Sequence, residues 1–199
     1  TRQFATIVIL LTSFLLSPVT LVAQVATNDW SRFNSVANGS KLSVKLKSGK
    51  FNFDKTVLID GEFIIDMRSL MAGDVSEEDQ IKLTNDLKST NFFEVKKFPT
   101  AKFHLTKILP LANGTYNSTV YGDFTLKGVR KTISFPANVY ITQFTVIIES
   151  AKFSLNRRDF KVFYQSSLKD YFIKNEMDIQ FKISTEKLDN ENRVPVKKK

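Results

Sequence analysis

Residues 87–103 read LKSTNFFEVKKFPTAKF, and no other run in this chain says more about its fold. Ser89 ends a polar helical stretch, and Pro99 keeps the residues around it out of a helix. Phe92 and Phe93 are adjacent, so they cannot both face one side of a regular element. After the proline, apolar and polar residues alternate. The stretch therefore predicts a helix end, an aromatic corner and the entry into a β-strand, in that order.

Alternating apolar and polar residues dominate the chain on both sides of this stretch. The alternation predicts strands over residues 41–47, 51–53, 62–67, 103–106, 120–126, 133–141, 147–155 and 179–183. Several dipeptides are typical of tight turns: Ser48-Gly49, Asp60-Gly61, Asn113-Gly114 and Lys127-Gly128. Asp60-Gly61 fits a β-bulge equally well. Roughly seven or eight strands at this spacing predict an antiparallel sandwich or barrel.

One segment departs from the strand period. Ser76 is followed by three acidic residues, which is a capping-box start, and acidic residues in a first turn stabilise the helix dipole. Leu83 and Leu87 lie four residues apart and share one helix face. The segment predicts an α-helix over residues 77–89, and a second short helix or turn is expected over residues 166–171.

The N-terminal segment has the order of a secretory signal peptide. Arg2 supplies a positive charge, residues 4–16 are almost all apolar, and Ala23 is a small residue at a cleavage point. The apolar run is shorter than the ~20 residues that a membrane-spanning helix needs, and an uncleaved anchor is the alternative. We expect a periplasmic or secreted protein divided into a signal peptide (1–23), one β-barrel domain (24–188) and a polar basic tail (189–199).

The composition limits the chemistry that this chain can perform. Cysteine is absent, which excludes disulfides, thiolate catalysis and cysteine-ligated zinc. The single histidine, His104, lies between apolar residues of a predicted strand, so we expect it to face solvent and not to act as a metal ligand or a base. Neither a nucleophile elbow nor a phosphate-binding glycine loop is present. We expect neither enzymatic activity nor a cofactor. The alternative is an enzyme that acts on a lipid without a cofactor, and an activity that is lost in the His104→Ala variant would support it.

The chain carries a net charge of +9. Lysines in residues 41–47 alternate with apolar residues, which is the pattern of a solvated barrel exterior. A platform that stacks single-stranded nucleic acid on aromatic rings would look similar, but the predicted export removes that partner. We expect no nucleic acid and, instead, contact with anionic phospholipid headgroups. A homodimer is compatible with the sequence.

Four ordered blocks resemble the YceI-like family of polyisoprenoid-binding proteins. Residues 87–103 are similar to the HLKS-x-DFFDV-x-KYPTAxF motif of that family. The other blocks are Leu46–Gly49 with Gly61–Met67, then Gly122–Lys131, then Ala151–Arg157 followed by Phe160 and Tyr164. The resemblance extends from Trp30 to about Ile183. Asp86, Ser40 and Lys161 depart from it at positions where members often carry His, His and Gly.

The resemblance implies a mainly β fold, an extended lipocalin-like antiparallel barrel of about eight strands with one or two short α-helices. It also implies an apolar tunnel that holds a long isoprenoid or another amphiphilic chain. The side chains expected to line that tunnel are chosen for their inward position in the strand alternation and for their aromatic size. They are Phe51, Phe53, Phe63, Ile65, Phe92, Phe93, Phe103, Phe124, Phe153, Phe160 and Tyr164. Arg157 is the candidate for a polar contact at the mouth, although a structural ion pair explains it equally well.

Two functions fit these residues. The first is binding, with transport or storage, of a polyisoprenoid or another long-chain lipid, because each methylene buried from water gains about 0.8 kcal/mol. The second is a secreted structural or protein-interaction domain whose 18 phenylalanines form a solid core without a ligand. The open volume inside the barrel distinguishes the two.

Overall fold

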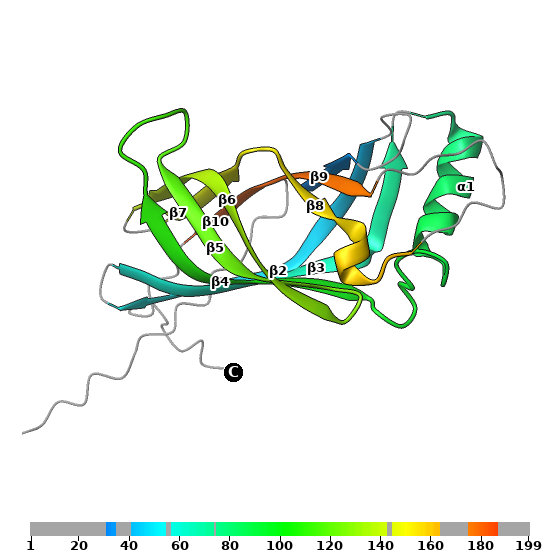
Figure 1. The fold of residues 1–199 in the computed structure, drawn as a ribbon, viewed down its shortest axis with the longest axis horizontal. Helices are drawn as coiled ribbons and strands as arrows, with labels where there is room; N and C mark the ends of the chain where they lie inside the picture. The colour runs from blue at the N-terminus through cyan, green and yellow to red at the C-terminus, as the bar shows by residue number, and fades with distance from the viewer. Residues whose placement is uncertain are drawn as a thin grey trace, which may run out of the picture.

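The computed structural model describes residues 31–34, 41–54, 57–73, 75–142, 145–163 and 175–186. Within them lie ten β-strands, one α-helix and one short 3-10 helix. Figure 1 shows the strands curling around a common axis, with α1 (Glu77–Lys88) at one end. The predicted signal peptide, basic tail and second helix, together with Tyr164, lie outside the described residues. No helix in the described part is both long and apolar enough to cross a bilayer.

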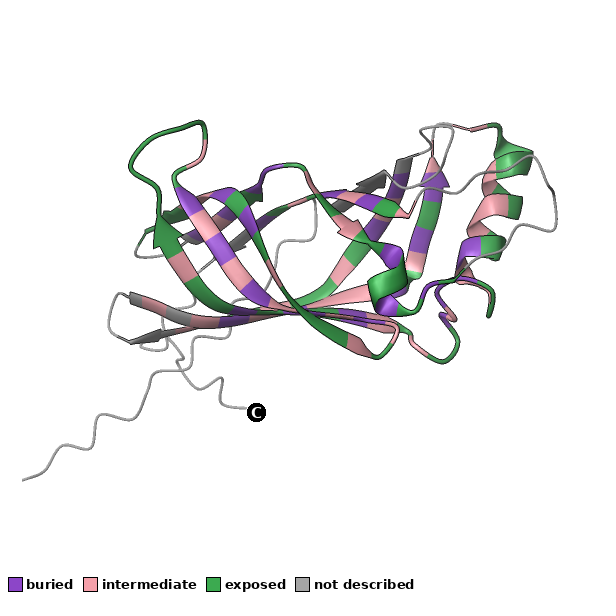
Figure 2. Cartoon of the chain, in the orientation of Figure 1, coloured by how far each residue is buried: buried purple, intermediate pink, exposed green. Residues whose placement is uncertain are grey.

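The first six strands pair antiparallel in chain order. They are β1 (Ser31–Asn34), β2 (Lys41–Asp54), β3 (Val57–Gly73), β4 (Thr100–Pro110), β5 (Ser118–Leu126) and β6 (Val129–Ile141). Buried and partly exposed residues alternate along the whole of β5 (Figure 2), as a strand with one face on the core requires. The predicted alternation of 120–126 is therefore confirmed.

The last four strands close the sheet into a barrel. They are β7 (Thr145–Ser150), β8 (Phe153–Asn156), β9 (Glu176–Gln180) and β10 (Lys182–Glu186). β7 pairs with β6 and β10, whereas β8 pairs with β9, which also pairs with β1. The amide of Ser150 donates to the carbonyl of Phe181 at 2.9 Å, which links the two pairs into one ladder. This ladder joins both ends of the sheet.

The strand predicted over 147–155 is therefore interrupted at Ala151 and Lys152, and the next strand is interrupted at Phe181. When each interrupted strand is counted once, the ten strands make the eight of the expected barrel. Closure satisfies the edge groups that an open sheet would expose. The fold class that the sequence predicts, a mainly β antiparallel barrel with one or two short α-helices, is confirmed, and the described residues contain one α-helix.

The turn predicted at Ser48-Gly49 is wrong. Both residues lie inside β2 and pair with β3, and the register shifts between Leu46 and Ser48. The extra residue, Lys47, reverses the parity of the strand, so that Leu46 before it and Phe51 after it both face the interior. A bulge therefore produces the change of parity that a turn was expected to produce.

Asp60 and Gly61 also lie within a strand. They pair with Asn52 and Phe51 in the β2–β3 ladder, beside another register shift. The bulge alternative for this dipeptide is therefore the correct one.

Two hairpin predictions are confirmed. Lys127 and Gly128 form the two-residue loop between Leu126 and Val129, with φ of 50° and 74°. Positive φ at both central residues is the geometry that matches the twist of the flanking strands. The Asn113-Gly114 dipeptide lies in the loop between β4 and β5.

The helix and the corner after it dock on one end of the barrel. The Ser76 Oγ accepts a hydrogen bond from the amide of Asp79 at 3.2 Å, as the predicted cap requires. The amide of Phe93 then donates to the carbonyl of Leu87 at 3.1 Å, so the aromatic corner satisfies the last turn of α1. Phe92 and Phe93 are both buried, and their rings lie edge to face with centroids 4.6 Å apart.

The corner is tied to the barrel by Lys127 of the β5–β6 hairpin. Its Nζ donates to the carbonyl of Phe92 at 2.9 Å and lies 2.9 Å from Oε1 of Glu94. The hydrogen bond from Lys127 holds the pKa of the Glu94 carboxylate below its ordinary value. The aromatic corner within residues 87–103 is thus anchored to a distant hairpin, since Lys127 and Phe92 are 35 positions apart.

Candidate functional site

The barrel interior contains a cavity whose lining side chains are all apolar; it is hereafter the large cavity, since a smaller apolar one lies beside it. Six aromatic rings line it: Phe63, Phe103, Phe124, Phe135, Phe153 and Phe181. Six aliphatic side chains complete its wall: Leu46, Ile65, Ile133, Leu155, Ile179 and Ile183. They come from strands around the whole barrel, from β2 to β6 and from β8 to β10. Such a wall offers a ligand hydrophobic and dispersion contacts only.

The large cavity is narrow. The space between its atoms is about 500 Å³, including the part open to solvent, but the centre of a water molecule can reach only about 40 Å³ of it. Phe135 stacks on Phe153 with ring centroids 4.6 Å apart, and Phe181 lies edge-on to Phe135 at 5.3 Å. The space is therefore too narrow for an elongated apolar chain unless some of these rings rotate.

The structure gathers five of the predicted lining residues around this cavity: Phe63, Ile65, Phe103, Phe124 and Phe153. Phe51 lies behind them, fully buried, with its ring edge-on to Phe63 at 5.0 Å. The backbone of Phe53 pairs with Leu58 at the end of β2, and its side chain lies outside the described part of the chain. Phe51 therefore supports the lining and does not form it.

The other lining residues are not among those predicted from the sequence. Phe135 and Phe181 are the largest of them, and both belong to predicted strands on which inward parity was visible. Ring size and parity were the available signals, and they apply to Phe135 as well as to Phe124. What the sequence could not show is which inward rings lie at the middle of the barrel and which lie in its wall.

A second apolar cavity, hereafter the small cavity, lies nearer α1. Its lining consists of Leu42, Met67, Leu70, Phe93, Ala101, Phe124, Leu126 and Met177. The space between its atoms is about 330 Å³, of which the centre of a water molecule reaches about 10 Å³. Two more predicted residues belong here: Phe93 lines this cavity, and Phe92 packs against Phe93.

A bulge in β3 shapes the small cavity. Lys45 pairs with Asp66 and Ser43 pairs with Met71, so one residue of β2 faces the four residues 67–70 of β3. In a regular strand Met67 and Leu70 would point to opposite faces, yet both are buried and both line the small cavity. The bulge therefore turns one additional large side chain inward.

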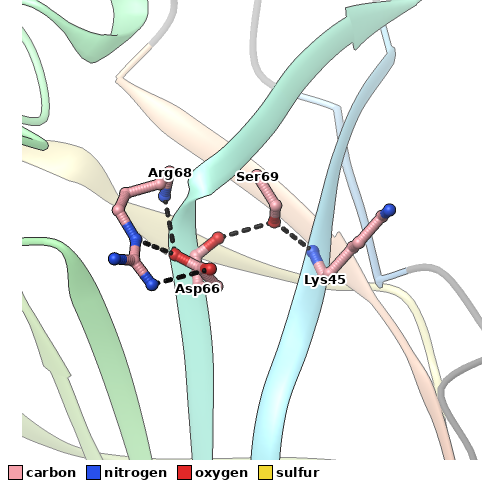
Figure 3. Close-up of polar contacts among 4 residues, drawn as sticks. All are labelled: Lys45, Asp66, Arg68 and Ser69. Atoms are coloured by element: carbon pink, nitrogen blue, oxygen red, sulfur yellow. Dashed lines mark hydrogen bonds and ion pairs between the residues drawn. The ribbon is translucent and has the colours of Figure 1, made fainter.

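Polar contacts close this bulge on its outer side (Figure 3). The Ser69 Oγ donates to the carbonyl of Asp66 at 2.6 Å and accepts from the amide of Lys45 at 2.7 Å. Arg68 holds the Asp66 carboxylate with two side-chain hydrogen bonds of 2.8 and 3.1 Å. These bonds from Arg68 keep the pKa of Asp66 below its ordinary value. The side chain of Ser69 thus replaces a ladder partner that the bulge removes.

Two glycines make room for aromatic rings inside the barrel. A Cβ on Gly122 would lie 2.4 Å from Cζ of Phe103 and 2.5 Å from the carbonyl oxygen of His104. A Cβ on Gly61 would lie 2.9 Å from the ring of Phe51. Each ring therefore occupies the space that a side chain would fill on the neighbouring strand.

Arg157 lies in the 3-10 helix η1 (Arg157–Phe160), away from the lining of either cavity. It is buried, its Nη1 donates to the carbonyl of Val162 at 2.7 Å, and its guanidinium lies 5.9 Å from the ring centre of Phe92. Burial, with a smaller effect of Arg158, lowers the pKa of Arg157. These contacts support a structural role, and a contact with a ligand headgroup stays a prediction.

Phe160, the last residue of η1, is buried with its ring edge-on to Phe124 at 5.5 Å. It touches the ring that both cavities share, so it positions a lining residue without lining a cavity itself.

His104 points away from the interior, as predicted. Its side chain is about half exposed, and its Nε2 lies 2.8 Å from Oδ1 of Asp60 on the outer face of β3. No group of three or more histidine or carboxylate side chains in the described residues is placed to hold a metal ion.

Sequence comparison identifies the family. Residues 20–185 match the model of the YceI-like domain. A UPF0312 protein of Shewanella denitrificans is 29% identical over 90 residues, which are 45% of this chain and 44% of that protein. The chain thus aligns with less than half the length of this curated relative.

Solved structures share the fold at low identity. A polyisoprenoid binding domain from Saccharophagus degradans superposes with a TM-score of 0.61 at 12% identity, over 84% of this chain and 99% of that one. BcnA of Burkholderia cenocepacia gives a TM-score of 0.59 at 22% identity, over 77% and 95% of the two chains. The YCEI protein of Campylobacter jejuni gives 0.51 at 17% identity, over 74% and 82%. From the family match and this shared architecture, the chain belongs to the YceI-like family.

Proposed function

We propose that this protein binds a polyisoprenoid or another long-chain amphiphilic lipid inside its barrel. The large cavity is the observation that carries the proposal, because all twelve side chains that line it are apolar. A ligand that matches such a wall has a long hydrocarbon part and no polar group along it.

The energetics support this class of ligand. Each methylene that leaves water gains about 0.8 kcal/mol, so a chain of several isoprene units compensates for the rotation of a few packed rings. The structural neighbour from Saccharophagus degradans is a polyisoprenoid binding domain, which supports the same chemistry. Binding of this kind needs no catalytic group.

The proposal includes carriage or storage of the lipid outside the cytoplasm. The order of the first 23 residues supports export, and the net charge of +9 supports contact with anionic headgroups during loading or release. Cosedimentation with phosphatidylglycerol vesicles tests the second point: binding that weakens as salt is added agrees with it, and equal binding to neutral vesicles contradicts it.

Native mass spectrometry of protein purified from cells by mild extraction tests the binding itself. We expect a population whose added mass is that of a long-chain lipid and which loses this mass on denaturation. A single ligand-free species, both after purification and after incubation with farnesol or geranylgeraniol, would contradict the proposal.

The narrow width of the large cavity favours one rival function. With only about 40 Å³ open to the centre of a water molecule, the packed rings also fit the description of a solid core. The protein would then be a structural or protein-interaction domain without a ligand. Thermal denaturation separates the two, because a ligand that binds only the folded barrel raises the melting temperature and a solid core gives no such shift.

A further inference from the structure

Phe124 occupies a special position among the described residues, since it alone lines both the large and the small cavity. It lies on the inward face of β5 with 5% of its surface exposed. Every other lining residue belongs to one cavity or to the other. The aromatic ring of Phe124 therefore forms a partition between two apolar spaces.

The two cavities lie end to end along the barrel. On β4 the large cavity is lined by Phe103 and the small cavity by Ala101, two residues further toward the α1 end. The same order holds on β3, from Ile65 to Met67, and on β9, from Ile179 to Met177. Two residues span about 6.6 Å of strand. The small cavity is thus the continuation of the large one behind the Phe124 ring.

We propose that Phe124 sets the length of the apolar chain that the barrel accepts. With the ring in place, a chain ends in the large cavity; with the ring turned aside, the chain continues past Ala101 and Leu126 toward Phe93. The inference rests on the proposed lipid-binding function and adds the residue that determines which chain lengths fit.

Two neighbours hold the partition in place. Phe103 is the Cα partner of Phe124 on β4, so their side chains stand next to each other on the inner face. Phe160 lies edge-on to Phe124 at 5.5 Å. Because Phe160 belongs to η1 and lines neither cavity, the position of this short helix determines how freely the partition turns.

The test measures the affinity of the purified full chain for geraniol, farnesol, geranylgeraniol and longer polyprenols in turn. Wild type is compared with Phe124→Leu, which keeps an apolar side chain for folding but removes most of the ring. The matched control is Phe153→Leu, because Phe153 lines the large cavity only. A double variant, Phe124→Leu with Ala101→Leu, fills the small cavity again.

We expect wild type to reach its tightest binding at a certain chain length and Phe124→Leu to bind the next longer polyprenol at least tenfold more tightly than wild type does. Phe153→Leu should leave the preferred length unchanged, and the double variant should restore it. An unchanged length preference in a folded Phe124→Leu protein would overturn the inference while leaving lipid binding intact. Failure of wild type to bind any member of the series would instead overturn the proposed function, and this inference with it.

Discussion

Gly122 has no side chain at the point where the ring of Phe103 crosses β5. A Cβ at this position would lie 2.4 Å from that ring and 2.5 Å from the carbonyl oxygen of His104, so only the hydrogen of glycine fits. Gly61 has the same relation to Phe51, with a nearest approach of 2.9 Å. At both positions the sequence pairs an inward glycine with a ring from a neighbouring strand, which is a compact way to fill a barrel with phenylalanine.

Gly122→Ala is expected to destabilise the protein more than Gly61→Ala. Overpacking of this kind costs about 1–3 kcal/mol, and at Gly122 the clash includes a backbone oxygen that cannot move without disturbing the β4–β5 ladder. At Gly61 the nearest atoms belong to side chains, which can shift. Urea unfolding of both variants measures the difference; equal stability of the two would contradict this account of the packing.

The ion pair of Glu94 with Lys127 makes the stability of the corner after α1 depend on pH. The hydrogen bond from Lys127 lowers the pKa of Glu94 from 4.5, so this carboxylate stabilises the folded state above that value. The contribution is lost as the pH falls through the lowered pKa, where the folded carboxylate takes up a proton.

We therefore expect Glu94→Gln and Lys127→Met to be less stable than wild type at neutral pH and to lose less stability on acidification below pH 4.5. Urea midpoints measured across this range test the prediction. Lys131→Met is the control, since Lys131 is an exposed lysine on the same hairpin. An acid loss in Glu94→Gln as large as in wild type would show that other carboxylates control it.

Among the elements, the bulge in β3 has the clearest consequence for the site. It directs both Met67 and Leu70 inward and so forms much of the wall of the small cavity. Its geometry depends on Ser69, whose hydroxyl bridges the amide of Lys45 and the carbonyl of Asp66. The bulge is held by side chains on the solvent side and acts on the packing inside.

Ser69→Ala is expected to cost about 1 kcal/mol, because the Lys45 amide loses its acceptor within the ladder. Ser43→Ala is the control: the contact of the Ser43 hydroxyl with the carbonyl of Met71 is long, at 3.5 Å, so its loss should change the urea midpoint little. A loss of equal size in both variants would show that the hydroxyl of Ser69 has no special role in the bulge.

The sequence predicted the elements well where local patterns determine them. The α1 cap at Ser76, the Lys127-Gly128 hairpin and the alternation of β5 all follow from a few neighbouring residues. The bulge beside Ser48-Gly49 did not follow, because this dipeptide has the composition of a turn and only its pairing with β3 shows that the strand continues. The interruption of the seventh strand at Ala151 depends likewise on pairing with distant residues.

The candidate site was predictable in kind but not in detail. Inward parity identified Phe63, Phe103 and Phe124 as interior rings, and the cavity contains them. It could not separate Phe51, which lies in the wall, from Phe135, which lines the cavity, because both are inward phenylalanines. That distinction depends on the diameter of the closed barrel and the register of its strands.

For the whole molecule, a lipid that binds only the folded barrel must stabilise it. Geranylgeraniol at a hundredfold excess over its dissociation constant should add about 2.7 kcal/mol to the free energy of unfolding and raise the melting temperature accordingly. Differential scanning fluorimetry of the purified chain measures the shift, with short alcohols such as butanol as controls. An equal shift with butanol and geranylgeraniol would indicate a solvent effect and not a bound chain.

Lipid binding requires that the barrel open its aromatic interior to a long apolar chain. A crystal structure of the protein purified from cells by mild extraction would reveal this opening. We predict continuous density running through the large cavity, with Phe135 and Phe153 moved apart from their 4.6 Å stacking distance. An empty interior in which these two rings remain stacked, even after soaking with geranylgeraniol, would show that the barrel does not admit such a chain.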